Sequence, residues 1–201
     1  MKNFEKELPS GYNEVFKIDA VSKKTGLILN CIALVIAIIT VLVGCIPLFL
    51  QNGVSFKIAS LEFLLLDVIF LVSMILYMVL HELTHGAAYK LLTGEKLTFG
   101  LSWSCAFCGV PNIYVYRRAS LIALVAPLVL FTAVFAVLSA VMFFIGPAYY
   151  ILSLILFGLH LGGCAGDGYV TALFLFKFKD KRTLIKDTGP KQYIYVPEEV
   201  D

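Results

Sequence analysis

Residues 119–166 read ASLIALVAPLVLFTAVFAVLSAVMFFIGPAYYILSLILFGLHLGGCAG, a run of 48 residues without Asp, Glu, Lys or Arg. About 20 apolar residues in a helix cross a hydrocarbon core, so the run is long enough for two crossings. Gly146-Pro147 interrupts it, and this pair is typical of a turn. The stretch therefore predicts two membrane helices joined by a tight turn.

The composition of the whole chain agrees with a membrane environment. Hydrophobic residues make up 60% of the 201 residues and charged residues 15%, against roughly 45–50% and 25% in soluble domains. A soluble fold of this composition would expose large apolar patches, which monomeric soluble proteins rarely do. The net charge is only +2. Without a dense basic tract, nothing favours a nucleic-acid partner.

Two further apolar stretches raise the expected number of spans to four. Residues 26–56 contain no charged side chain, and residues 68–92 begin hydrophobic all round. We therefore predict an all-α membrane protein with four transmembrane helices and a small cytoplasmic β-hairpin between the second and third. The predicted segments are an N-terminal segment 1–25, spans at about 26–50, 66–92, 119–145 and 148–176, a hairpin loop 93–118 and a C-terminal tail 177–201, with a strand candidate at 192–196.

The basic residues predict the orientation of the spans. Five Lys or Arg precede Gly26, one (Lys57) lies in the first loop, four lie at 90–118, none at Gly146-Pro147, and six follow from Lys177. Cytoplasmic loops carry the excess of Lys and Arg, so both termini and the middle loop are expected in the cytoplasm. The first apolar stretch starts too late and is too long for a cleavable signal peptide. We expect a multi-pass protein of the cell membrane.

The middle loop has a strand-like pattern. Residues 96–118 read KLTFGLSWSCAFCGVPNIYVYRR, rich in aromatic and β-branched residues, with a turn signal at residues 109–112. This hairpin is either a structural cap or a strand edge that receives an extended peptide by β-addition, and the sequence leaves both open. Cys105 and Cys108 form a lone C-x-x-C, which we interpret as two reduced cysteines, because a structural zinc site needs two further ligands. The odd number of cysteines, five, is no disulfide framework.

His81-Glu82-Leu83-Thr84-His85 is the H-E-x-x-H pattern, in the second span. On a helix the two histidines share one face and can ligate Zn²⁺ together, and Glu82 can serve as the general base for a water molecule at the metal. Ionisable residues within a span are costly and usually mark function. The motif therefore predicts a metal site for amide hydrolysis.

A catalytic zinc needs a third protein ligand, and Asp167 is the best candidate. Asp167 is the acidic residue of the fourth span, and glycines on both sides could admit close backbone approach. With span ends at Lys90 and Lys177, His81 and Asp167 lie about 14 and about 15 Å inside the cytoplasmic boundary. The alternative is a buried aspartate that caps a broken helix or pairs with a neighbouring residue. Glu62 and Asp67 are poorly placed because they lie two turns or more from His81 on the same helix.

Two other residues inside the spans carry weaker expectations. His160 stands about 10 Å outward of Asp167 and is not expected to be a ligand, although a role around the metal site or at the substrate is left open. Pro127 is expected to kink the third span, because proline removes a helix hydrogen bond.

These residues together resemble the membrane-embedded site-2 protease class of zinc metallopeptidases, and more specifically a small bacterial family described as putative zincin peptidases. The resemblance implies that His81, His85 and Asp167 are zinc ligands, that Glu82 is the catalytic base, and that the host is bacterial. It covers most of the chain: the H-E-x-x-H helix with Gly86, the strand-rich loop, Ala126-Pro127, Gly166-Asp167-Gly168, and Asp187-Thr188-Gly189-Pro190 before residues 193–196.

The sequence departs from site-2 proteases in one stretch. Those proteases carry an asparagine and a proline upstream of the aspartate, where this chain has His160-Leu161-Gly162-Gly163. Substrate positioning by the same means is therefore not implied.

Three functions compete on this pattern. The leading hypothesis is a membrane-embedded zinc metalloprotease that cuts membrane protein segments or peptides near the cytoplasmic side of the bilayer, with homo-oligomerisation left open. The second is a non-catalytic zinc-binding scaffold or sensor. A transporter is the weakest, because four spans without an inverted repeat make a poor transporter monomer. Iron or manganese could use similar ligands.

Overall fold

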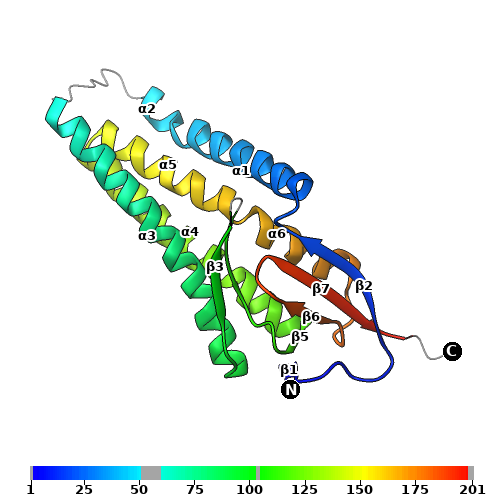
Figure 1. Cartoon of the computed structure of the whole chain (residues 1–201). Helices are drawn as coiled ribbons and strands as arrows, with labels where there is room; N and C mark the ends of the chain where they lie inside the picture. Colours follow the sequence, from blue (N-terminus) through cyan, green and yellow to red (C-terminus); the bar gives the residue numbers. More distant parts are fainter. Residues whose placement is uncertain (1, 51–59, 103–104, 199–201) are drawn as a thin grey trace. The chain divides into compact units, whose positions relative to one another are not determined.

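The structure is a computed structural model that describes residues 2–50, 60–102 and 105–198. Within these residues, four helical stretches are long and apolar enough to cross a membrane. They agree with the expected number of spans, and they run over Lys23–Leu50, Leu61–Thr93, Arg117–Ile145 and Pro147–Lys177 (Figure 1). The first loop, with Lys57, lies outside the described residues.

Two of these stretches are interrupted. The first consists of α1 (Lys23–Gly44) and α2 (Ile46–Leu50), and the last consists of α5 (Pro147–Gly163), α6 (Ala165–Ala172) and the π-helical turn η1 (Leu173–Lys177). The other two are the single helices α3 (Ser60–Thr93) and α4 (Arg117–Ile145). Pro127 lies inside α4, which continues for several turns beyond it. The expected kink at Pro127 stays a prediction.

The chain divides into two compact units, which are described separately. One comprises Met1–Leu29, His81–Pro127 and Gly166–Asp201, and the other comprises Asn30–Leu80 and Leu128–Ala165.

In the second unit, α1 and α5 approach closely along small residues. A Cβ atom built on Gly158 would lie 2.8 Å from the carbonyl oxygen of Ala37, and one on Gly162 would lie 2.4 Å from that of Ala33. Small residues four apart let helix backbones pack tightly in membranes, where lipid gives no hydrophobic drive for helix association. The sequence also allows close backbone approach at Gly166 and Gly168, but a Cβ atom on either would meet no described atom within 4 Å. The close contacts of α5 therefore lie before Asp167.

The first unit contains a five-stranded antiparallel sheet, so the expectation of an all-α fold was wrong. Its strand order is β1-β5-β6-β7-β2, and Figure 1 shows β7 between β6 and β2. The fold is mixed α and β and contains four long apolar helices, a five-stranded sheet and a two-stranded hairpin. The strands are β1 (Phe4–Glu5), β2 (Tyr12–Asp19), β5 (Tyr114–Tyr116), β6 (Leu184–Asp187) and β7 (Lys191–Pro197). Of these, only β7 was expected as a strand outside the hairpin loop.

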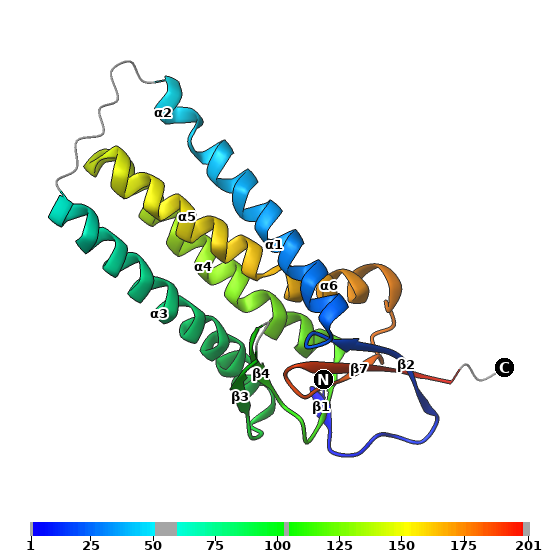
Figure 2. The ribbon, with the colours of Figure 1, turned by 45° about the horizontal axis from the view of Figure 1, so that its top comes forward.

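The expected hairpin exists, with its turn in a different place. It pairs β3 (Thr98–Leu101) with β4 (Ala106–Gly109), as Figure 2 shows. Strand pairing ends at Ser102 and Cys105, whose backbones hydrogen-bond at 2.8 Å, and Trp103 and Ser104 lie outside the described residues. The predicted turn at residues 109–112 instead leads from β4 into β5, which joins the large sheet. The proline-containing turn at residues 109–112 therefore connects strands of two different sheets.

One hydrophobic core joins the sheet to the helix segments of the first unit. Val115, Ile185 and Ile194 come from adjacent strands, pair in register and are fully buried. They pack in one cluster with Tyr89 of α3, Ala123 of α4, and Val170 and Phe174 after Asp167. Fully buried side chains of this kind are the main favourable contribution to folding. The core therefore fixes the helix segments that carry His85 and Asp167 relative to each other.

Candidate metal centre

The helix α3 places His81 and His85 on one face. They stand four residues apart, and their rings meet edge to face with centroids 4.9 Å apart. Both side chains are buried, with only 7% of each residue exposed. The helix continues past them to a glycine, Gly94, whose positive φ of 71° allows the left-handed residue that commonly ends a helix. The H-E-x-x-H stretch is therefore well inside a regular helix rather than at a frayed end.

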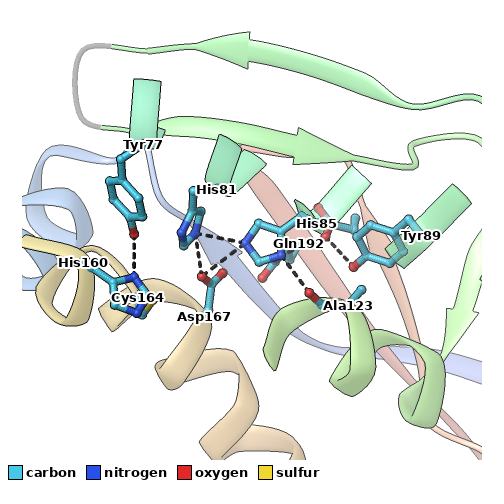
Figure 3. A network of polar contacts seen from close by, with 10 residues as sticks. Tyr77, His81, His85, Tyr89, Ala123, His160, Cys164, Asp167 and Gln192 are labelled. Atoms are coloured by element: carbon cyan, nitrogen blue, oxygen red, sulfur yellow. Dashed lines mark hydrogen bonds and ion pairs between the residues drawn. The ribbon is translucent and has the colours of Figure 1, made fainter. Parts of the chain in front are cut away.

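Asp167 reaches the histidines from α6. The helical stretch breaks at Cys164, and Asp167 falls in the first turn of the new helix, where the helix dipole favours a carboxylate. Its Oδ2 lies 3.3 Å from Nε2 of His81 and 3.2 Å from Nε2 of His85. The two Nε2 atoms are themselves 3.2 Å apart. Figure 3 shows the three side chains converging on one point.

This triangle of donor atoms could hold a metal ion. Among the residues that the structure describes, His81, His85 and Asp167 form a group whose ligand atoms all lie within 4.8 Å of one another. The structure thus brings together the three residues that the sequence singled out as ligands. Their role as ligands stays a prediction.

The ring nitrogen of His85 that points away from the triangle, Nδ1, makes a hydrogen bond that determines which ring nitrogen carries the proton. Nδ1 of His85 lies 2.8 Å from the carbonyl oxygen of Ala123. A carbonyl only accepts, so Nδ1 carries the proton, and the neutral ring then turns the lone pair of Nε2 toward Asp167. Two acceptors at 3.2 Å repel unless a proton or a metal cation lies between them. Metal-binding histidines characteristically donate their other N–H in this way.

Glu82 lies beside the triangle and contacts the hairpin. Its carboxylate interacts electrostatically with His81, His85 and Asp167, and also with the backbone N–H of Cys108 in β4. Burial raises the pKa of the Cys108 thiol to about 12. That thiol is therefore neutral at physiological pH.

His160 belongs to a polar cluster in the second unit. Its Nδ1 lies 2.8 Å from the Tyr77 hydroxyl, as Figure 3 shows, and its Nε2 lies 3.0 Å from the Thr132 hydroxyl. The ring is fully buried and packs edge to face on Tyr77 and Phe131. Both ring nitrogens are thus engaged by hydroxyl groups from other helices.

Three contacts that orient the site lie outside the motif and were missed. They are the Ala123 carbonyl, the Cys108 backbone, and a buried hydrogen bond of 2.9 Å from Tyr89 to Asp187. Contacts made by backbone groups cannot be predicted from residue types, because almost every residue has the same backbone groups. The pair of Tyr89 and Asp187 had one available signal, since Tyr89 continues the four-residue spacing of His81 and His85 along α3.

Fold and site together define a class: a chain with membrane-type helices and a buried His-His-Asp group that could hold a metal ion. A family model described as "Putative zincin peptidase" matches residues 74–182, more than half of the chain. The chain belongs to this family, and the matched region contains His81, His85 and Asp167. No curated protein and no solved structure matches the chain.

We predict that Asp167→Ala lowers the metal bound per chain from about one ion to near zero, because the remaining two histidines do not make a stable site. Elemental analysis of the purified, detergent-solubilised protein after zinc loading measures this. Asp67→Ala is the matched control, because Asp67 is exposed on α3 and its loss should change nothing. Full metal content in Asp167→Ala, with loss in His81→Ala, would show that another residue is the third ligand.

Proposed function

We propose that this protein is a membrane-embedded zinc metallopeptidase that hydrolyses peptide bonds of membrane-associated substrates near the cytoplasmic side of the bilayer. The observation that carries the proposal is the triangle of His81, His85 and Asp167, with Glu82 next to it. The family description gives independent support.

The spacing of the donor atoms supports zinc. Zinc bonds of 2.0–2.2 Å in tetrahedral geometry separate neighbouring ligand atoms by about 3.3–3.6 Å. The three separations in the triangle are 3.2, 3.2 and 3.3 Å, which is close to one face of such a tetrahedron. Two imidazoles and one carboxylate leave the fourth position open, as catalytic zinc sites require. His81, His85 and Asp167 would hold the ion.

The residues around the ion would divide the chemistry. A bound zinc ion supplies Lewis acidity, which makes water more acidic and polarises a carbonyl group. Glu82 takes the proton from the attacking water at its carboxylate and returns it to the amine that leaves. The backbone N–H of Cys108 interacts with this carboxylate and favours its orientation toward β4. Burial of both histidines keeps bulk water from competing for the ion.

The outer edge of β4 supports an extended peptide as the substrate. Ser102 and Cys105 form a hydrogen-bonded pair, so in antiparallel alternation the backbone groups of Ala106 and Cys108 point away from β3. The contact from Cys108 to Glu82 lies on this same edge. A peptide that pairs with this edge by β-addition passes its backbone over Glu82. This favours the second of the two roles that the sequence left open for the hairpin.

The apolar helices support a substrate that is itself in the membrane. Four helices are long and apolar enough to span, and the basic residues favour a cytoplasmic location for both termini and the hairpin loop. The substrate class is then a membrane protein segment or peptide that reaches the cytoplasmic half of the bilayer. The lipid bilayer is the other partner, and the bacterial cell membrane is the proposed location.

We predict that Glu82→Gln reduces peptide cleavage at least 100-fold and leaves zinc content unchanged, because the amide cannot accept the proton from water. A library of internally quenched peptides, incubated with the protein in nanodiscs, measures cleavage. Glu95→Gln, a change of the same kind just beyond the end of α3, should cleave like the parent. Cleavage by Glu82→Gln at the parent rate would contradict the mechanism. Zinc without cleavage in the parent would favour the scaffold or sensor.

A second prediction concerns the edge of β4. Ala106→Pro removes one N–H from this edge, so the KM for the peptide that the parent cleaves fastest should rise about 2- to 12-fold, as expected for one hydrogen bond of about 0.5–1.5 kcal/mol. Ala106→Val keeps the N–H and serves as the control. An unchanged KM in Ala106→Pro, at full zinc content, would rule out this edge as the substrate strand.

A further inference from the structure

Asp187 ends β6 and is buried with three hydrogen-bond donors around its carboxylate. Only 2% of the residue is exposed. Its Oδ2 accepts from the Tyr89 hydroxyl at 2.9 Å and from Nε2 of Gln192 at 3.3 Å, and its Oδ1 accepts from the backbone N–H of Gly189 at 2.9 Å. Burial raises the pKa of Asp187 to about 6, and the three donors oppose this rise. The group is therefore mostly ionised at pH 8.

Through Tyr89, Asp187 holds the helix that carries the candidate metal centre. Tyr89 is 1% exposed and stands four residues beyond His85. Residues at this spacing share one helix face, and Figure 3 shows His81, His85 and Tyr89 in succession along α3. A hydrogen bond at Tyr89 therefore restrains this face in two ways. It limits sliding of α3 along its axis and rotation of α3 about that axis.

The turn from β6 to β7, which begins at Asp187 and contains Gly189, also contacts the end of β4 through its backbone. The carbonyl oxygen of Asp187 accepts from the N–H of Val110 at 2.8 Å. One residue earlier, a Cβ atom built on Gly109 would lie 2.3 Å from the backbone nitrogen of Gly189. Gly189 has a φ of 93°, in the left-handed region that favours glycine, and it packs against the ring of Phe107. The two glycines allow the turn and the end of β4 to touch backbone to backbone.

Cys108 lies between Phe107 and Gly109, the two residues that contact Gly189. Its backbone N–H interacts with the Glu82 carboxylate. Asp187 therefore contacts both structures that meet at Glu82: the helix through its side chain and the strand through its carbonyl group. A shift of either contact would change the distance between Glu82 and the edge of β4.

We propose that Asp187 and Tyr89 are a positioning pair that locks α3 against β4 and so sets the orientation of Glu82. Among the described residues, neither side chain hydrogen-bonds to the candidate ligands, and both act through the elements they hold. The consequence for catalysis rests on the proposed function, whereas the mechanical link between α3 and β4 does not.

The alkylation of two buried cysteines in one sample tests this link. Cys108 reports on β4, and Cys164, buried in the second unit, reports on global unfolding. The full chain in detergent at pH 8 is treated with iodoacetamide, and peptide mapping by mass spectrometry gives the rate at each cysteine. The variants are Asp187→Ala and Tyr89→Phe. The matched control is Asp180→Ala, which removes a carboxylate that bonds only to Arg182 among the described contacts.

We expect Asp187→Ala to raise the labelling rate of Cys108 at least tenfold, with the Cys164 rate and the zinc content unchanged. Tyr89→Phe should give a smaller rise at Cys108 alone, and Asp180→Ala should give none. In peptide cleavage, both positioning variants should lower kcat at full zinc content. Absence of cleavage in the parent would refute the proposed function. The labelling rate of Cys108 would still decide whether Asp187 and Tyr89 connect α3 to β4.

Unchanged Cys108 labelling in both variants would overturn the proposal. If Asp187→Ala labels both cysteines equally fast and loses zinc, it has unfolded, and Tyr89→Phe then decides. A selective rise at Cys108 in Tyr89→Phe supports the positioning pair, and no rise overturns it.

Discussion

The rest of the structure depends on one electrostatic constraint, the approach of the lone pair of His85 to the carboxylate of Asp167. Because Nδ1 keeps its proton and donates it in a hydrogen bond to the Ala123 carbonyl, Nε2 faces Oδ2 as a second acceptor at 3.2 Å. In a buried site such a contact is costly unless a cation neutralises it. The arrangement is stable with a proton or a metal ion between the two atoms, and the nearby Nε2 of His81 completes a set of donors that suits a metal.

The fold around this contact keeps the three donor atoms together. The helical stretch breaks at Cys164, so that Asp167 begins a new helix. Side chains after Asp167 then pack with Ala123 and Tyr89 against the inner face of the sheet. The sheet is thus the common support for segments of three helices, and its turn from β6 to β7 also reaches the hairpin beside Glu82. Local unfolding of this support would separate the donor atoms without disturbing the H-E-x-x-H helix itself.

Much of the helical part could be predicted because long apolar runs and a helical four-residue spacing are local properties. Asp167 was found by its depth in a span, which is a simple length argument that needs no tertiary knowledge. The sheet was missed because its strands are short and its pairing is not local: Phe4 pairs with Val115, and Tyr12 pairs with Pro197. Residues 109–112 carry a correct turn signal, but no local pattern tells a hairpin turn from a connection between sheets. Backbone contacts such as those of Ala123 and Cys108 depend on the complete fold.

X-ray absorption at the zinc edge of the zinc-loaded, full-length protein tests the central claim most directly. If His81, His85 and Asp167 bind the ion, the first shell contains only nitrogen and oxygen neighbours at about 2.0–2.2 Å, with the scattering pattern of two imidazoles. A sulfur neighbour at about 2.3 Å would place a cysteine in the site and contradict the ligand set. A chain that binds no zinc at all would contradict the account of the triangle as a metal centre.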